Sequence, residues 1–220
     1  FAKDFSETRQ RLQPGVTRII ETLPPTAKVL DLGSGNGELA EEIGRRGYTG
    51  TYLGLDFSDA FVTISNARKL DFAQFKQSDL TNEAWAENLA PASCDTIYCF
   101  AVMHHIPSEV LRNQFLARIH GLLKPEGLFV HSHWQFLTNQ RLRARIQPWD
   151  KVELADKDLD EGDYLMDWRR GGQGLRYVHH YSQSELAVLA QQNDFIISEE
   201  FYSDGESQNL GLYQVWKLAL

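Results

Sequence analysis

The residues best suited to chemistry in the first half of the chain are three carboxylates and three glycines at the ends of strand-like segments. The run Asp31-Leu32-Gly33-Ser34-Gly35-Asn36-Gly37 closes an apolar strand at 28–32 and leads into a helix at 37–46. Glycines let a backbone turn tightly and approach a ligand, and a helix N-terminus offers N–H groups to a carboxylate. Asp56 ends the next strand, where it suits the hydroxyls of a ribose, and Asp79 follows a third strand, where it could accept from an adenine amino group. The pattern therefore indicates a nucleoside ligand.

The spacing of the loop separates two kinds of nucleoside ligand. A dinucleotide-binding loop has the pattern G-x-G-x-x-G/A, but counting from Gly33 puts Glu38 at its last position. Asp31 would also repel an anionic pyrophosphate, whereas it would not repel a cationic sulfonium. The loop thus favours a positively charged sulfur nucleoside over a dinucleotide. A glycine-rich turn without a ligand is the remaining interpretation.

Histidines follow two further strands. His104 and His105 come just after a strand at 96–101, and His131 and His133 share one side of the segment that begins at 128–131. Ligands of open α/β sheets bind beyond the carboxyl ends of the strands, so several imidazoles are expected to converge there. Alternatively, His104 and His105 cap or pack beneath a helix at 108–123. The motif offers no neighbouring Asp, Glu or Cys ligands, so no metal site is expected.

A polar insertion at about 138–180 holds the other concentration of chemically useful side chains. Trp168, Arg169, Arg176 and His179 lie in it, beside glycines at 171, 172 and 174. Binding residues are common on loops that a rigid scaffold positions, and the glycines suggest a mobile lid. The alternative is a surface insertion whose aromatic residues only cover the sheet.

These groups need a scaffold that brings strand ends together, and the order of elements predicts one. Helical and strand-like segments alternate, which is typical of βαβ units with a parallel sheet. Strands are expected at 28–32, 51–56, 72–77, 96–101, 128–131, 194–202 and 211–218. Helices are expected at 7–22, 37–46, 59–69, 108–123 and 183–192, with Ser58 and Ser108 as N-caps and a turn at 124–127. The chain, 1–220, would then form one α/β domain with a polar lid insertion.

Composition limits the class of protein and its partners. The 220 residues are 42% hydrophobic and 11% aromatic, enough to bury the core of one α/β domain. The formal net charge of −8 disfavours strong, non-specific affinity for a phosphate backbone. Charges run through the N-terminal segment and no apolar run reaches the roughly 18 residues of a membrane span, so we expect a soluble, cytoplasmic protein. Cys94 and Cys99 match no zinc pattern and are expected as buried, reduced thiols.

The glycine loop and the strand-end acids together resemble the class I S-adenosylmethionine-dependent methyltransferases across residues 27–134. The resemblance implies S-adenosylmethionine (SAM) as cofactor and a Rossmann-like, seven-stranded, mostly parallel sheet whose last strand is antiparallel. Asp56 corresponds to the family's ribose acid, and Ser78-Asp79-Leu80 resembles its adenine-contacting segment. The cofactor-binding residues implied are Asp31, Gly33, Gly35, Gly37, Asp56, Phe57, Asp79, Leu80, Phe100 and Ala101.

A narrower resemblance rests on three further motifs. Phe5-Ser6-x-Thr8-Arg9, Ala101-Val102-x-His104-His105 and Arg176-Tyr177-x-His179, the last followed by Ser182-x-x-Glu185-Leu186, look like the tRNA wobble-uridine carboxymethyl methyltransferases. Those enzymes esterify the carboxylate of 5-carboxymethyluridine. The resemblance implies that Arg9, His104 and His105 line the active site, and Trp168, Arg169, Arg176 and His179 are then expected on the substrate side.

Two alternatives to a tRNA substrate stay open at this point. The acidic surface and the compact insertion also suit a small-molecule methyltransferase with a closed pocket. A catalytically idle, cofactor-binding partner subunit of a larger modification complex would instead show a large exposed apolar patch. Both alternatives keep SAM as the ligand and differ in what lies beyond its sulfonium.

Overall fold

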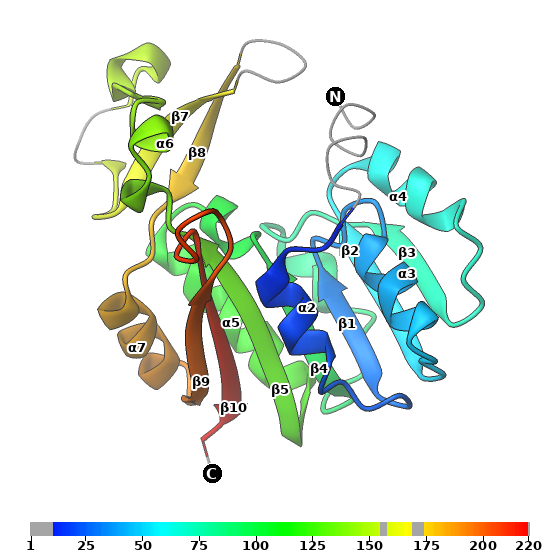
Figure 1. The fold of residues 1–220 in the computed structure, drawn as a ribbon. Helices are drawn as coiled ribbons and strands as arrows, with labels where there is room; N and C mark the ends of the chain where they lie inside the picture. The colour runs from blue at the N-terminus through cyan, green and yellow to red at the C-terminus, as the bar shows by residue number, and fades with distance from the viewer. Residues whose placement is uncertain (1–10, 155–157, 169–173, 220) are drawn as a thin grey trace.

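A seven-stranded sheet forms the centre of the molecule, which is described by a computed structural model for residues 11–154, 158–168 and 174–219 (Figure 1). Its strand order is β3-β2-β1-β4-β5-β10-β9. The bounds are β1 Lys28–Leu32, β2 Thr51–Asp56, β3 Ala73–Gln77, β4 Cys94–Phe100, β5 Leu123–Trp134, β9 Phe195–Ser203 and β10 Gly211–Leu218. The strands pair in parallel from β3 to β5, and β10 is antiparallel to both of its neighbours. The expected seven-stranded, mostly parallel fold is therefore confirmed.

Helices cover both faces of this sheet. The longer ones are α2 Pro14–Ile20, α3 Glu38–Arg45, α4 Asp59–Asn66, α5 Glu109–Leu122 and α7 Gln183–Gln192. Serines cap three of them: the side chains of Ser58, Ser108 and Ser182 accept hydrogen bonds from the amides of Phe61, Leu111 and Glu185. Each such cap satisfies one backbone donor that the first helical turn leaves unpaired. The two caps expected from the sequence, Ser58 and Ser108, are confirmed.

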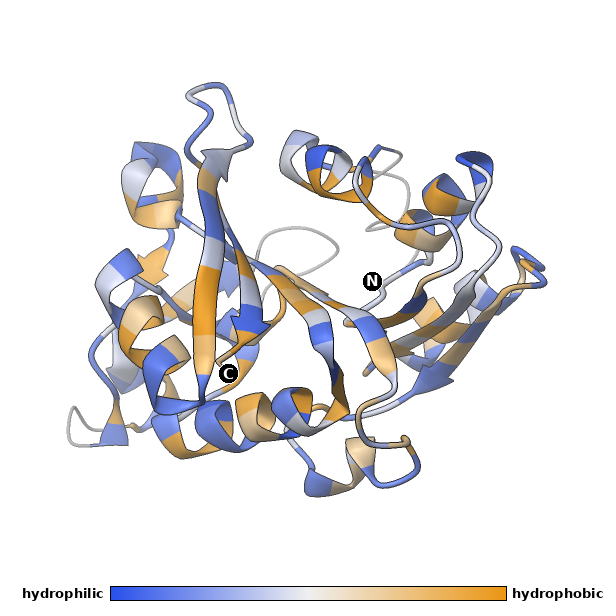
Figure 2. Ribbon diagram, turned by 90° about the horizontal axis from the view of Figure 1, so that it is seen from below, coloured by the Kyte–Doolittle hydropathy of each residue, from blue (hydrophilic) through white to orange (hydrophobic). Residues whose placement is uncertain are grey.

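The core lies in two layers, one on each side of the sheet. Neighbouring strand residues face opposite ways, so Val29 packs with Val16, Ile19 and Ile43 of the α2 and α3 layer, whereas Leu30 packs in the α5 and α7 layer. Strands buried on both faces read as continuous apolar runs, which is why their existence was readable from the sequence. The central strands are largely orange in Figure 2, and the helices that flank them carry blue segments.

Several boundaries differ from the sequence-based expectation, and three of these differences have a clear local cause. The first described helix begins at Pro14, because Pro suits position N1 and forces Gln13 into an extended conformation with φ −62° and ψ 145°. Residues 124–127 do not form a separate turn; they bulge within β5, whose register with β4 shifts between Cys94 and Thr96. Ala101 lies outside β4, with a φ of 56° that no strand residue adopts.

The insertion contains a second, small antiparallel sheet in the order β6-β7-β8. Its strands are β6 Ile146–Gln147, β7 Asp163–Trp168 and β8 Gly174–His179, and it also holds α6 Gln140–Arg143. Phe136, Met166 and Val178 give it a buried cluster of its own. Figure 1 shows this unit beyond one end of the main sheet, at the upper left. The sequence predicted a polar insertion but not its strands, because charged residues interrupt the apolar alternation.

Two further expectations concern the whole chain. Within the described ranges, no helix is long and apolar enough to cross a bilayer. Cys94 and Cys99 are buried and free, as expected. Short 3-10 helices in the described part of the chain include Glu83–Ala86, Met103–His105, Phe136–Thr138 and Trp149–Val152. The second of these carries the histidine pair that the sequence singled out.

Candidate functional site

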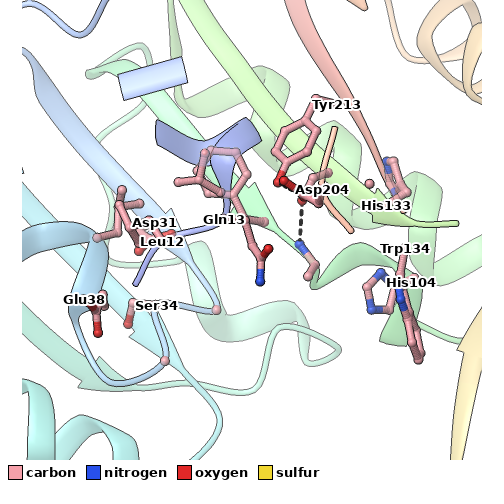
Figure 3. Close-up of a pocket in the computed structure, with 18 of the residues that line it drawn as sticks. Leu12, Gln13, Asp31, Ser34, Glu38, His104, His133, Trp134, Asp204 and Tyr213 are labelled. Carbon is pink, nitrogen blue, oxygen red and sulfur yellow. Dashed lines mark hydrogen bonds between the residues drawn. The ribbon is translucent and has the colours of Figure 1, made fainter. Parts of the chain in front are cut away.

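A pocket of about 400 Å³ opens at the carboxyl ends of β1 and β4, where the strand order of the sheet reverses. Such a switch point is where open α/β sheets bind ligands. In Figure 3, Asp31, Ser34 and Glu38 lie on one side of the pocket, and His104, His133 and Trp134 lie on the other. The site residues expected from the sequence that line it are Asp31, Gly33, Gly35, Phe100, Ala101, His104, His105 and Arg176.

The glycine loop forms the floor of the pocket next to β1. The amides of Gly33 and Ser34 both donate to the carbonyl of Leu55, at 2.7 and 3.0 Å, which folds the loop back over β2. Gly33 has a φ of 78°, and a Cβ there would lie 2.1 Å from a methyl group of Val102, so only glycine fits. Gly35 also has a positive φ, but a Cβ there would meet nothing within 4 Å. The loop is therefore closely packed behind Gly33 and open in front of Gly35.

Asp31 contributes a buried carboxyl group to this floor. It is 3% exposed, and its Oδ2 accepts a hydrogen bond from the hydroxyl of Tyr52. Burial raises the pKa of Asp31 to about 7, the bond from Tyr52 lowers it, and the nearby charge of Asp56 raises it further. A carboxyl poised near neutrality in a pocket ionises readily when a cation arrives, which is the chemistry expected of a site for a positively charged ligand.

Five of the expected cofactor residues lie outside the pocket lining. Gly37 is the N-cap of α3, and Leu80 packs against the α5 core layer. Asp56 is close to the loop, since its two oxygens accept from the amides of Gly35 at 2.8 Å and Ser58 at 2.9 Å. Phe57 is 71% exposed, and Asp79 is exposed and accepts from the backbone and hydroxyl of Thr81. Asp56, Phe57 and Asp79 therefore continue from the pocket along the ends of β2 and β3.

The other side of the pocket begins where β4 ends. The amide of Ala101 donates to the carbonyl and to the hydroxyl of Ser132, both at 3.1 Å, which holds its left-handed backbone in place. A non-glycine residue keeps that strained conformation only where surrounding contacts hold it, and such residues cluster at functional sites. The chain then turns into the 3-10 helix with His104 and His105, whose ring centroids are 4.4 Å apart. The histidine pair is thus brought to the pocket.

The substrate-side residues of the insertion divide into three groups. Arg176 lines the pocket, with its guanidinium 5.0 Å from the ring centre of Trp134. His179 is fully buried outside the pocket lining, and both of its ring nitrogens meet carboxylates. Arg169 lies outside the described residues, as does Arg9 of the N-terminal segment, and for Trp168 only the backbone is described.

The structure adds pocket residues that the sequence analysis did not select. Asp204 is 7% exposed; its Oδ1 accepts from the amide of Gly15 at 3.0 Å and its Oδ2 from the hydroxyl of Tyr213 at 2.6 Å. Both Asp204 and Tyr213 line the pocket, and they attach the start of α2 to the C-terminal hairpin. No local pattern signals a contact that joins residues 189 positions apart. Asp204 lies in the loop between β9 and β10.

The histidines of β5 pair with each other. His131 Nδ1 lies 2.7 Å from His133 Nε2, and His133 lines the pocket. Burial lowers the pKa of His131 to about 3, so both rings are neutral at physiological pH. Among the residues that the structure describes, no group of three or more His, Cys, Asp or Glu side chains could hold a metal ion.

Comparison with known proteins gives the class of this chain. A family model described as a methyltransferase domain matches residues 5–200. The chain therefore belongs to the methyltransferase domain family and is a SAM-dependent methyltransferase, with SAM as its cofactor. This agrees with a buried acid and an open glycine loop at the switch point of the sheet.

Relatives differ in what they methylate. The tRNA (carboxymethyluridine(34)-5-O)-methyltransferase ALKBH8 of Mus musculus is 31% identical over 160 residues, which cover 70% of this chain and 22% of that protein. A ubiquinone biosynthesis O-methyltransferase of Paracidovorax citrulli is 34% identical over 118 residues, covering 54% of this chain and 45% of that protein. The chain thus spans less than half the length of either relative.

Solved structures share the fold at low sequence identity. A SAM-dependent methyltransferase from Methanosarcina mazei has a TM-score of 0.71 at 20% identity and covers 95% of this chain and 99% of its own. A chain from the complex between the Haloferax volcanii Trm112 methyltransferase activator and a methyltransferase also has a TM-score of 0.71, at 14% identity, covering 100% and 94%. At these identities the likeness concerns the fold alone.

Proposed function

We propose that SAM binds along the carboxyl ends of β1, β2 and β4. Its methionine part lies over Gly33, Gly35 and the start of α3, and its ribose hydroxyls bind Asp56. The adenine lies by Phe57, Asp79 and Leu80, beyond the pocket lining, and Phe100 and Ala101 border the reactive end. The open space in front of Gly35 and the carboxylate at the end of β2 support this placement.

The chemistry of the pocket supports a cationic nucleoside. SAM carries a sulfonium and an ammonium group, and the buried carboxyl of Asp31 can balance positive charge in that region. The first amides of α3 can receive the methionine carboxylate, as helix N-termini do. A pyrophosphate would meet Asp31 and Glu38, which both line the pocket. The residues present therefore fit SAM better than a dinucleotide.

Replacing Asp56 by alanine is expected to weaken SAM binding by about 1–3 kcal/mol. The substitution removes the acceptor for the ribose hydroxyls and leaves the amide of Gly35 without its partner. Isothermal titration calorimetry measures the change, with Asp71→Ala as a control at an exposed carboxylate just before β3. Equal affinities for the two variants would contradict the placement of the ribose.

For the methyl acceptor, the geometry best supports a carboxylate, such as that of a carboxymethylated wobble uridine in tRNA. The observation that carries this proposal is the convergence of His104, His105 and Arg176 on one pocket. A carboxylate is already ionised at pH 7, so it needs no general base but does need cationic or donor groups to hold it. The similarity to the carboxymethyluridine methyltransferase ALKBH8 supports the same acceptor.

The reaction is an in-line displacement at a methyl carbon. When bound, SAM would supply a methyl group on its sulfonium, and the neutral thioether would be the leaving group. The chain's own residues then have two tasks, to align the carboxylate oxygen with that methyl and to exclude water. Arg176 holds the carboxylate between the imidazoles of His104 and His105. Arg9, which the resemblance implies for the same active site, adds a second guanidinium in this proposal. Trp168 and Arg169 complete the substrate side in this proposal.

The decisive assay uses purified chain, methyl-labelled SAM and bulk tRNA whose wobble-uridine esters have been saponified. We expect label to enter the saponified tRNA and to be released by mild alkali, because a methyl ester is base-labile whereas methyl ethers and methylamines are not. Arg9→Ala is expected to reduce the rate by about a hundredfold, since one lost carboxylate contact also misaligns the nucleophile. Arg18→Ala, at an exposed arginine of α2 outside the pocket lining, is the control.

A small-molecule acceptor is the second candidate. The similarity to a ubiquinone biosynthesis O-methyltransferase favours it, and a cavity of about 400 Å³ lies within the usual size of small-ligand pockets. In the same assay, alkali-stable label in a small-molecule extract, with none in tRNA, would decide for this candidate. Cofactor binding without turnover on either pool would indicate that the chain works with a partner subunit.

A further inference from the structure

His179 lies between two carboxylates at the base of the insertion. Its Nδ1 is 2.6 Å from Asp163 Oδ1, its Nε2 is 2.7 Å from Glu185 Oε1, and the ring is fully buried. Ionised carboxylates can only accept, so both ring nitrogens must carry protons and the ring is an imidazolium. Burial opposes that charge, but the hydrogen bonds to Asp163 and Glu185 leave the pKa of His179 above its ordinary value.

Arg112 extends this cluster to α5. It is 2% exposed; its Nη2 contacts Asp160 Oδ2 at 2.5 Å, and its Nη1 donates to the hydroxyl of Tyr177 at 3.1 Å. The hydroxyl of Tyr177 in turn donates to Asp163 Oδ1 at 2.6 Å. We call these six residues the clasp: Arg112, Asp160, Asp163, Tyr177, His179 and Glu185. The clasp joins α5, β7, β8 and α7, so it fixes the insertion to the body of the fold.

Other titratable groups around His179 are few. The ring of Tyr181 lies 4.5 Å away by ring centroids, and the charge of Arg112 lowers the pKa of His179, as a like charge does. His133 and His180 are close enough for the charge of His179 to lower their own pKa values. None of these neighbours is a carboxylate that could compete with Asp163 and Glu185 for the ring of His179. The imidazolium is therefore balanced by the two acids that it touches.

Strand β8 connects the clasp to the pocket. Two and three residues before His179, it carries Tyr177 and Arg176. The carbonyl of Tyr177 lies 3.2 Å from Nδ1 of His105, and Arg176 lines the pocket over Trp134. A shift of β8 would therefore move the acceptor-side contacts His105 and Arg176 together. The glycine loop and Asp31 are attached to β1 and β2 and do not depend on it.

We propose that His179 is a positioning residue whose imidazolium, held between Asp163 and Glu185, fixes β8 and so sets His105 and Arg176 against the methyl acceptor. The inference rests on the proposed function, because it takes those two residues as acceptor contacts. The contacts of the clasp require the charged form of His179. The clasp is therefore complete at pH values below the ordinary histidine pKa, and it weakens as pH rises through the raised pKa of His179. Acceptor binding should therefore fail at alkaline pH before cofactor binding does.

The test compares wild type, His179→Gln and Glu185→Gln, with His120→Gln as a control histidine near the C-terminal end of α5. Acceptor KM and kcat are measured with saponified tRNA from pH 6 to pH 9, and cofactor Kd is measured by calorimetry. A glutamine can donate to only one of the two carboxylates, so His179→Gln is expected to raise acceptor KM about ten- to a hundredfold. Because glutamine does not titrate, the variant should also abolish the pH dependence of acceptor KM. Cofactor Kd should change by less than about twofold, as expected for distant sites.

Glu185→Gln keeps an oxygen that accepts from Nε2 but removes one negative charge. It should therefore move the alkaline rise of KM to a lower pH without abolishing turnover, and it serves as the decisive variant if His179→Gln does not fold. An unchanged KM in His179→Gln, an unmoved pH profile in Glu185→Gln, or equal losses of cofactor and acceptor binding would each overturn the proposal.

A substrate-free measurement separates this inference from the proposed function. Nitrogen-15 NMR of the imidazoles should show both nitrogens of His179 protonated at neutral pH and a changed His105 signal in His179→Gln. If wild type methylates no tRNA, the acceptor proposal is wrong, and the His105 signal alone decides on the clasp. A neutral His179 ring at pH 6, or an unchanged His105 signal, would overturn it.

Discussion

Asp31→Asn is expected to weaken SAM binding by about 2–5 kcal/mol, the range for removing one partner of a buried charge pair. Asparagine has nearly the same shape and can still accept from the hydroxyl of Tyr52, so the variant changes charge and little else. Calorimetry on the wild type and the variant at pH 8 measures the difference. Comparable affinities would show that Asp31 does not face the cationic part of the cofactor.

The same variant should remove a pH dependence. The pKa of Asp31 is raised to about 7 in the free protein, and a bound cation favours its ionised form. SAM affinity of the wild type should therefore rise between pH 6 and pH 8, by up to about tenfold per pH unit below the pKa. The affinity of Asp31→Asn should be flat over that range, whereas the exposed control Asp71→Asn should keep the wild-type slope.

Stability of the free protein should move in the opposite direction. The folded-state pKa of Asp31 lies above the ordinary value of 3.8, so protonation of Asp31 favours the folded state. This contribution to the free energy of unfolding is complete below pH 3.8 and is lost as pH rises through about 7. At pH 8 the free wild type therefore holds a buried charge that Asp31→Asn lacks. The variant should be more stable there by up to about 4 kcal/mol, measured by urea unfolding. Greater stability with weaker binding would identify a charge retained for function.

Local signals explain what could be predicted from the sequence. The glycine loop, Asp56 and the histidine pair each lie within a few residues of a strand end, so apolar runs and breakers were enough to place them at one edge of the sheet. Packing requires glycine at position 33, where a Cβ would meet Val102. That contact joins the first loop to the segment after β4, and the fold brings them together.

Long-range contacts explain which features of the site could not be predicted from the sequence. Asp204 reaches Gly15 across the molecule, and His179 is held by partners on β7 and α7. The residue types alone suggested that His179 would bind substrate, because a histidine in a polar insertion carries no sign of the carboxylates that enclose it. Spacing predicts which residues share a strand end, whereas only the folded chain decides which polar groups satisfy one another.

Arg112→Met should lower the free energy of unfolding by about 3 kcal/mol, the lower end of the range for breaking a buried ion pair. Methionine fills much of the same volume, but it leaves the hydroxyl of Tyr177 and the carboxylate of Asp160 without their donor. The lower end applies because the side chain of Asp160 is 37% exposed and can be rehydrated. Urea unfolding followed by circular dichroism measures the change.

Arg118 on the same helix provides the matched control. Its guanidinium lies 3.7 Å from a carboxylate of Glu83 that is 71% exposed, a surface pair of the kind that contributes at most about 1 kcal/mol. Arg118→Met should therefore cost well under half as much as Arg112→Met, although both remove one positive charge from α5. Equal costs would mean that helix charge, and not the buried clasp, sets the stability of this region. A larger cost at Arg112 would show that the insertion is fixed to the body of the enzyme by ionic contacts, since its own apolar cluster is small.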